Sequence, residues 1–142
     1  MSPRQALWEQ VDPTPPHFWL TLGYRGLESN TERTVIEWDA SADFSFDAGA
    51  EGRIIHGGLV ASLLDTAMGA ACFKALEDNE RFLTADLRTE FYRPARPGTL
   101  RAVARVVRRT RGVAFCTADL TDSGERLIAS ARCTQILRSE GA

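Results

Sequence analysis

The segment IIHGGLVASLLDTAMGAACF, residues 54–73, constrains this chain most, because it is apolar around the whole circumference of a helix. The run from Gly57 to Phe73 is short for a membrane span and rich in small residues, so we expect a buried core helix that ends near Leu76. Such a helix needs an apolar wrapper, which a strongly curved antiparallel sheet can supply. Asp65 places a carboxylate in the middle of this helix, and a charge in a buried segment requires an explanation.

Four runs with period-two alternation follow the helix, namely TADLRTEFYRP, LRAVARVV, VAFCTADL and RLIASARCTQIL. They are separated by ARPG, RRTRG and TDSGE, and TDSGE has the composition of a turn. The alternating segment TERTVIEWDA precedes the helix and places Ile36 and Trp38 on one face, while FDAGAEGR is typical of a loop. This order predicts an α+β fold in which a curved antiparallel sheet wraps a long central helix.

The chain is expected to form a single domain over residues 1–142, with residues 1–30 as a helical extension. Ser2 can cap and Pro3 can open a first short helix, and the aromatic piece HFWLTLG follows it. The start of the sequence lacks the basic residues and apolar run of a signal peptide, so we expect a cytoplasmic protein.

Composition narrows the possible classes of protein. With 44% hydrophobic and 25% charged residues the chain is expected to fold, and its net charge of -2 argues against a nucleic-acid binder. The histidines, His17 and His56, lie far apart and show no zinc-site spacing, so we expect no metal. The cysteines show no CxxC spacing and are expected to be free, reduced and mostly buried: Cys72, Cys116 and Cys133.

Several motifs together resemble the hotdog-fold acyl-CoA thioesterases of the PaaI-like, phenylacetate-pathway family. They are the loop FDAGAEGRIIHGG, the helix GGLVASLLDTAMGAA, the strand TADLRTEFYRP and the closing TDSGERLIASA, and they cover roughly residues 18–137. The resemblance implies a hotdog fold, hydrolysis of a CoA thioester, and a homodimer in which two sheets join, frequently as a dimer of dimers. It implies no cofactor beyond the coenzyme A of the substrate, and neither a nucleic-acid nor a membrane partner.

A helix that begins at Gly57 or Gly58 points free N–H groups and the positive end of its dipole outward, as a thioester oxyanion requires. Asp65 lies further along the same helix, roughly 12 Å away at 1.5 Å per residue, so the two ends cannot act on one carbonyl within one subunit. Antiparallel packing of two such helices in a two-fold dimer can bring Asp65 of one chain to the Gly57 amide of the other.

The resemblance implies that Asp65 is the catalytic carboxylate, either as nucleophile or as general base. It also implies that His56 positions the carbonyl and that Thr84 orients the water. The structural alternatives are an aspartate hydrogen-bonded in the interface, a capping histidine without a chemical role, and an ordinary strand threonine.

The segment 81–111 holds nine arginines against two acidic residues, which fits either a solvated sheet face or a site for a small polyanion. The phosphates of coenzyme A are the polyanion that the resemblance suggests, and the candidate ligands are Arg96, Arg108, Arg109 and Arg111. Many family members carry an asparagine six residues before the motif histidine. Here that position is Ala50, which leaves the water-positioning scheme open.

Two other functions on the same fold are open to this chain. Hotdog hydratases and dehydratases pair a histidine and a carboxylate in local patterns that are not found around His56. A non-catalytic acyl-CoA sensor predicts a missing acid or an appended DNA-binding segment. The tryptophans could line an acyl tunnel or belong to the core: Trp8, Trp19 and Trp38.

Overall fold

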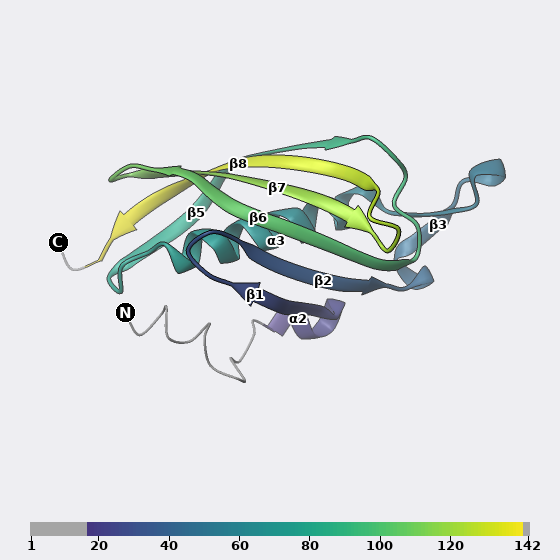
Figure 1. Cartoon of the computed structure of the whole chain (residues 1–142), viewed down its shortest axis with the longest axis horizontal. Coiled ribbons are helices and arrows are strands. Elements are labelled where there is room, and N and C mark those ends of the chain that lie inside the picture. The colour runs from purple at the N-terminus through teal and green to yellow at the C-terminus, as the bar shows by residue number, and fades with distance from the viewer. Residues whose placement is uncertain (1–16, 141–142) are drawn as a thin grey trace.

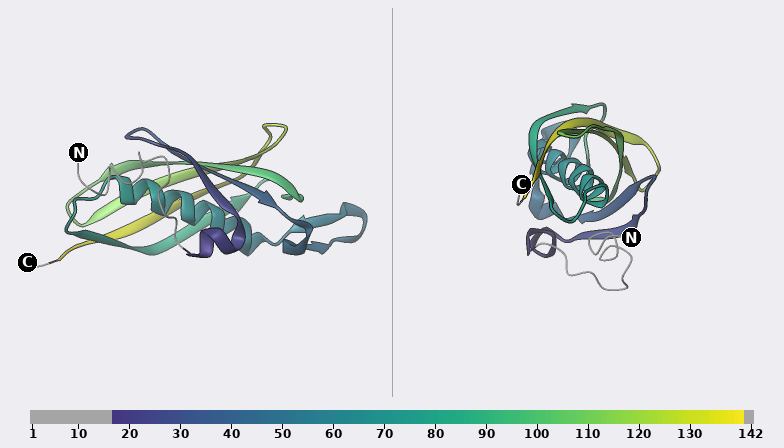
Figure 2. Two further views of the ribbon diagram at one scale, coloured as in Figure 1. Left: turned by 90° about the horizontal axis from the view of Figure 1, so that it is seen from below. Right: turned by 90° about the vertical axis from the view of Figure 1, so that its left-hand side faces the viewer.

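The computed structural model describes residues 17–140, and its central element is the helix α3, Gly57–Lys74 (Figure 1). Leu63, Leu64 and Met68 on this helix have no exposed surface. Seen along its axis, α3 lies inside the curve of the sheet (Figure 2). The buried central helix and its sheet wrapper are as the sequence predicts, and the α+β hotdog fold is confirmed.

The wrapper is one six-stranded sheet in the order β1-β2-β6-β7-β8-β5, and every neighbouring pair is antiparallel. The four strands predicted after the helix are all present. The strands are β1 Tyr24–Ser29, β2 Thr34–Ala40, β5 Glu80–Phe91, β6 Gly98–Arg109, β7 Val113–Asp122 and β8 Leu127–Ser139.

The segment expected to be a loop before α3 is a short hairpin that extends beyond the sheet (Figure 1). Its strands are β3 Ser45–Asp47 and β4 Arg53–Ile55, and the short helical turns η1 Ala42–Phe44 and η2 Gly49–Glu51 flank β3. Gly49 and Gly52 have φ angles of 69° and 76°, which only glycine adopts freely. These two residues therefore let the chain reverse at the tip.

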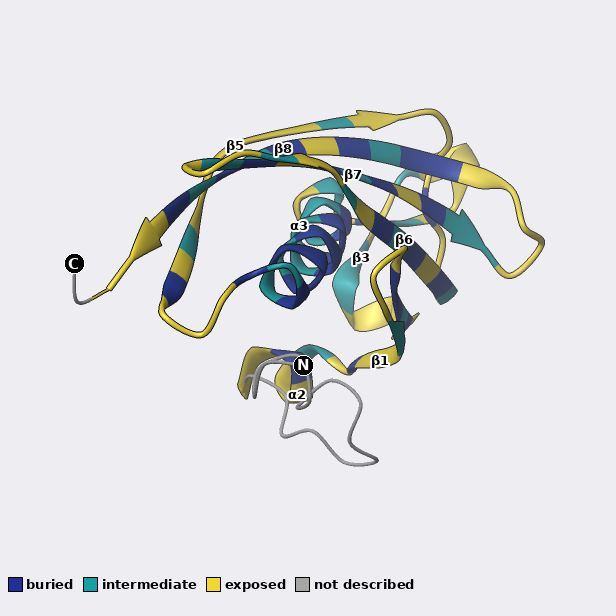
Figure 3. Cartoon of the chain, turned by 60° about the vertical axis from the view of Figure 1, so that its left-hand side comes forward, coloured by how far each residue is buried: buried dark blue, intermediate teal, exposed yellow. Residues whose placement is uncertain are grey.

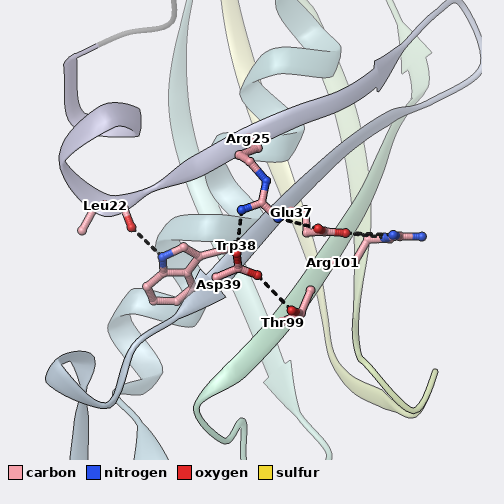
Figure 4. Close-up of polar contacts among 7 residues, drawn as sticks. All are labelled: Leu22, Arg25, Glu37, Trp38, Asp39, Thr99 and Arg101. Carbon is pink, nitrogen blue, oxygen red and sulfur yellow. Dashed lines mark hydrogen bonds and ion pairs between the residues drawn. The ribbon is translucent and has the colours of Figure 1, made fainter.

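The expected helical extension is only partly helical. Residues His17–Leu22 form α2, but Tyr24–Ser29 form β1, so the prediction of a helical segment up to residue 30 is wrong there. The Trp38 ring explains the difference, because its Nε1 donates to the Leu22 carbonyl oxygen at 2.7 Å (Figure 4). The Trp38 and Tyr24 rings also pack in a T-shaped arrangement with their centroids 5.5 Å apart. The helix expected after Ser2 lies outside the described residues.

Ion pairs on the outer face fasten β1 to the sheet. Arg25 donates to Glu37 at 2.5 Å and to Asp39 at 2.7 Å, and Arg101 on β6 donates to the same Glu37 at 2.8 Å (Figure 4). Asp39 also accepts from the Thr99 hydroxyl at 2.9 Å. These partners explain why a strand with few apolar residues pairs stably.

A β-bulge at Ala85 changes which face of β5 each side chain occupies. Before it, Thr84 lies opposite the buried Gln135, and after it, Leu87 lies opposite the buried Cys133. Residues that lie opposite each other across an antiparallel pair point to the same side of the sheet. Before the bulge the even-numbered residues of β5 therefore face α3, and after it the odd-numbered residues do. If the same sequence ran as a regular strand, without a bulge, alternation from Thr84 would turn Asp86 toward the helix in place of Leu87.

The cysteines are free and buried, as expected. Cys116 and Cys133 lie directly opposite each other on β7 and β8. Within residues 17–140 no helix combines the length and apolar character that a membrane span requires.

Candidate active site

The first turn of α3 is capped by His56 and leaves one amide open. The His56 Nδ1 accepts from the Gly58 N–H at 3.0 Å, and the His56 carbonyl accepts from Leu59 and Val60 at 2.9 and 3.2 Å. The Gly57 N–H donates to no acceptor among the described residues. This amide, at the positive end of the helix dipole, is therefore the donor available to an oxyanion.

The cap explains why both a histidine and a glycine stand here. A Cβ atom at position 58 would lie 3.0 Å from both Nδ1 and Cε1 of the His56 ring, so a larger residue would displace the cap. Since Nδ1 accepts a hydrogen bond, the neutral ring carries its own proton on Nε2. The Gly58 amide, expected to bind substrate, is instead used inside the protein.

Asp65 lies half-buried on the side of α3 that faces β5, since it meets the Thr84 hydroxyl of that strand. Its Oδ1 is 3.2 Å from the Thr84 hydroxyl oxygen, which in turn is 3.1 Å from the side-chain oxygen of Gln135 on β8. Burial raises the pKa of the Asp65 carboxyl, and the Thr84 hydroxyl opposes that shift. No described residue forms an ion pair with Asp65. The structure thus joins Thr84 to the acid, as the sequence analysis expected of a residue near it.

Asp65 and the open Gly57 amide stay apart within one chain. They are eight positions apart on a continuous helix, which corresponds to about 12 Å. A single chain therefore holds the amide and the carboxylate at two levels of the same helix.

The last part of β5 forms an apolar wall beside the start of α3. A Cβ atom at position 57 would lie 3.5 Å from the Phe91 ring, and Leu87 projects from the same face of the strand. The Thr89 hydroxyl lies between them, buried and without a hydrogen-bond partner. Leu87 and Phe91 are 38% and 52% exposed, so this wall is open in the protomer.

The arginines expected to bind phosphate have different surroundings. Arg96 donates to the Glu51 carbonyl oxygen and pairs with the Glu51 carboxylate at 3.6 Å, so it supports the β3–β4 hairpin. Arg109 donates to the Ala75 carbonyl at 2.6 Å and pairs with Glu80. Arg109 is therefore occupied at the C-terminal end of α3 and is not brought to Gly57.

Arg108 and Arg111 lie at the β6–β7 turn, beside Arg109, and are exposed. Neither side chain makes a hydrogen bond or ion pair with any residue in the described part of the chain. Within one chain they lie toward the end of α3 opposite Gly57. The 18 residues of α3 span about 27 Å.

Other candidates are placed in the core or at the surface. Trp19 and Trp38 are 5% and 0% exposed and belong to the core. Trp8 lies outside the described residues. Ala50 is exposed in η2, at the tip of the β3–β4 hairpin.

The sequence analysis did not single out Gln135, Thr89 or Phe91. Gln135 is fully buried, yet its position in an alternating strand gave no sign of the polar contact it makes. Phe91 belongs to the quoted YRP-containing strand, but only the bulge at Ala85 decides that it faces α3.

Among the described residues no group of three or more His, Cys, Asp or Glu side chains is arranged to hold a metal ion. The site offers a half-buried carboxylate, its hydroxyl partner and a helix N-terminal amide. These groups suit addition of water to an activated carbonyl.

Comparisons with known proteins agree with this chemistry. The sequence model of the Thioesterase superfamily matches residues 52–136. The medium/long-chain acyl-CoA thioesterase YigI of Salmonella typhimurium is 31% identical over 97 residues, which cover 59% of this chain and 63% of that protein. This chain therefore spans less than two thirds of the length of that relative.

Solved structures show the same fold. A phenylacetic acid degradation-related protein of Ralstonia eutropha JMP134 is 27% identical with a TM-score of 0.81, over 94% of this chain and 98% of that one. The thioesterase HI1161 of Haemophilus influenzae has a TM-score of 0.80 at 17% identity, over 96% and 97% of the two chains. The family resemblance read from the motifs is confirmed.

Proposed function

The chain belongs to the thioesterase superfamily, and on that premise we propose that it hydrolyses an acyl-CoA thioester to the free acid and coenzyme A. The observation that carries the proposal is one helix with an open Gly57 amide at its start and a half-buried carboxylate, Asp65, further along. An unsatisfied helix amide stabilises an oxyanion, and a carboxylate whose pKa is raised by burial is a stronger base than a free one.

In the proposed reaction the thioester oxygen accepts a hydrogen bond from the Gly57 N–H. Asp65 either takes a proton from the attacking water or attacks the carbonyl carbon itself, forming an anhydride that water opens. In both routes the C–S bond breaks and the sulfur of coenzyme A receives the proton that water loses. No cofactor takes part.

The two half-sites, the Gly57 amide and the Asp65 carboxylate, meet if two copies of the chain pair about a two-fold axis, so we propose a homodimer. Strand β5 is one of the two edges of the six-stranded sheet, is twelve residues long, and is mostly exposed (Figure 3). Leu83 on it is 70% exposed. An exposed edge strand presents unpaired backbone groups that favour pairing with another strand, and antiparallel pairing of two β5 edges would set two α3 helices side by side.

The same arrangement suggests where the coenzyme A lies. With two α3 helices antiparallel and Asp65 of one beside Gly57 of the other, the C-terminal end of one helix lies beyond the other's N-terminus. The unpaired Arg108 and Arg111 of one chain would then be available to the phosphates of a substrate bound at the other. The exposed wall of Leu87 and Phe91 suits an apolar acyl group, in keeping with the medium and long chains named for the YigI relative.

We also propose a cytoplasmic location, since the described cysteines are free thiols and the substrate is an acyl-CoA.

The test is release of the coenzyme A thiol from a panel of aromatic, medium-chain and long-chain acyl-CoAs. Asp65→Asn should abolish turnover while substrate binding, followed by calorimetry, persists. Thr117→Val, which removes a hydroxyl on β7 that donates to the Ala131 carbonyl, is a control of similar size. Binding without turnover by the unaltered protein would instead identify a non-catalytic acyl-CoA sensor.

A further inference from the structure

Four side chains form a continuous polar chain from the core to Asp65. Cys133 Sγ lies 3.3 Å from Gln135 Nε2, the Gln135 Oε1 lies 3.1 Å from Thr84 Oγ1, and that oxygen lies 3.2 Å from Asp65 Oδ1. The members come from α3, β5 and β8. Of these four side chains, only the Asp65 carboxylate takes part in the proposed reaction.

With the Gln135 amide in this orientation, one of the two hydrogen bonds at Thr84 lacks a proton. The Thr84 hydroxyl has a single proton, yet both Oε1 of Gln135 and the ionised Asp65 carboxylate need it. A half-turn of the amide removes the conflict, and the two orientations occupy the same space. Then Nε2 of Gln135 donates to Thr84, the Thr84 proton goes to Asp65, and the Cys133 S–H donates to Oε1.

Burial makes this choice matter. Gln135 has no exposed surface, so its amide cannot exchange a missing partner for water, and an unmade hydrogen bond there carries its full desolvation cost. Hydrogen bonding with Cys116, followed by burial, raises the pKa of the Cys133 thiol, so Cys133 keeps its proton, which the Cys116 sulfur and Oε1 of the turned amide share. With the amide turned, the Thr84 hydroxyl accepts from Gln135 Nε2 and donates its single proton to Asp65 alone.

We propose that Gln135 is a positioning residue for Asp65: its amide nitrogen donates to Thr84 Oγ1 and thereby holds the single hydroxyl proton of Thr84 on the Asp65 carboxylate. The amide acts through Thr84 and touches no substrate. The catalytic meaning of this inference rests on the proposed function, but the hydrogen-bond arrangement does not.

The charged surroundings of Asp65 leave Thr84 as its main partner. Burial and the Thr84 hydrogen bond are the influences on the pKa of Asp65, and the Cys133 thiol on β8 stays neutral beside it because the Asp65 charge is among the causes that raise the pKa of Cys133. Asp86 on β5 faces the other side of the sheet and accepts from the Thr134 N–H at 3.0 Å. Weakening the Thr84 hydrogen bond should therefore raise the pKa of Asp65.

The first experiment uses the unaltered protein and determines the amide orientation by NMR. Our arrangement expects strong nuclear Overhauser contacts from the Gln135 Nε2 protons to the Thr84 methyl group. It is overturned if those protons contact the Cys133 β-protons instead while Asp65 is ionised.

The second experiment measures the pKa of Asp65 from its carboxyl carbon shift in a double-mutant cycle. Thr84→Val should raise it by about half to one pH unit, the worth of one hydrogen bond. Gln135→Leu should raise it by a few tenths of a pH unit through lost polarisation of Thr84. In the Thr84→Val background Gln135→Leu should add nothing further.

A purely structural role for Gln135 predicts a different result, because Gln135→Leu would then lower the melting temperature and leave the Asp65 pKa unchanged. Equal shifts with and without the Thr84 hydroxyl would also overturn the proposal. Thr117→Val serves as the control for loss of a sheet hydroxyl and should leave the Asp65 pKa in place. A protein that shows the coupling but hydrolyses no acyl-CoA would refute the proposed function and leave the positioning role intact.

Discussion

Gly57→Pro is the sharpest test of the oxyanion half-site, because proline removes the one open amide of the first turn and little else. His56 is the N-cap and Gly57 is the first helical residue, where proline is well tolerated. His56 has φ -54° and ψ 128°, which is the conformation that a residue before proline prefers. The amide that is lost makes no hydrogen bond within the described part of the protein.

The expected magnitude follows from these contacts. Loss of one oxyanion donor lowers kcat by about 10²–10³, or roughly 3–4 kcal/mol of transition-state stabilisation. Stability should not fall, because replacing glycine by proline at a compatible position stabilises by about 0.4–1 kcal/mol. Phe91, 3.5 Å from a Cβ at this position, leaves contact distance for the ring.

The assay is thiol release under saturating substrate, with melting followed by circular dichroism. Gly57→Ala is the matched control, since it fills the same space beside Phe91 and keeps the N–H. We expect the alanine variant to stay within a few-fold of the unaltered protein and the proline variant to be nearly inactive but folded. A folded proline variant with kcat reduced less than about five-fold would refute the assignment of this amide to the oxyanion.

Three further predictions concern the dimer, the acid and one ion pair. When Gly57→Pro subunits are mixed with Asp65→Asn subunits and allowed to exchange, about a quarter of the activity of the unaltered protein should return, because half the dimers are mixed and each has one intact site. No recovery would mean that both groups of a site belong to one chain. Because the pKa of Asp65 is raised in the folded protein, ionisation of this carboxyl lowers the stability as the pH rises through that pKa, so Asp65→Asn should raise the melting temperature at pH 7. For the same reason the acidic limb of the kcat profile should lie above the ordinary aspartate pKa of about 3.9. The hydrogen bond from Arg109 lowers the pKa of Glu80, so this pair stabilises the fold above about pH 4.3 and loses its effect as the pH falls through the lowered pKa. Arg109→Met should therefore lower the free energy of unfolding, measured in urea, by about 1–3 kcal/mol at pH 7 and by much less at pH 3.

Periodicity was sufficient for the large elements. An apolar run without a polar face has to be enclosed, and the alternating runs after it supply the enclosing strands, so α3 and β5 to β8 could be predicted. Strand β1 could not, because RGLES carries no alternation and pairs through Arg25 contacts with residues far along the chain.

Candidate site residues on local motifs are easier to single out than those that depend on distant partners. Asp65 and Gly57 stand out as candidates from their own neighbours in the sequence. The occupied state of Arg109 and the buried contact of Gln135 could not, because a sequence shows that a group is charged or polar and not what it meets. Gly58 illustrates the same point at short range, since its amide is consumed by the His56 ring two positions earlier.

The bulge at Ala85 has a consequence for how this gene can vary. Most surface strands tolerate loss or gain of a residue at their ends, but here a single residue inserted between Ala85 and Asp86 would shift the parity of every later position in β5. Asp86, Arg88 and Glu90 would then line the space where the substrate's acyl group is proposed to lie, and Leu87 and Phe91 would turn to water. Loss of Ala85 would only convert the bulge into regular pairing and keep Leu87 opposite Cys133, so deletions at position 85 should be tolerated among functional relatives and insertions beside it should be rare.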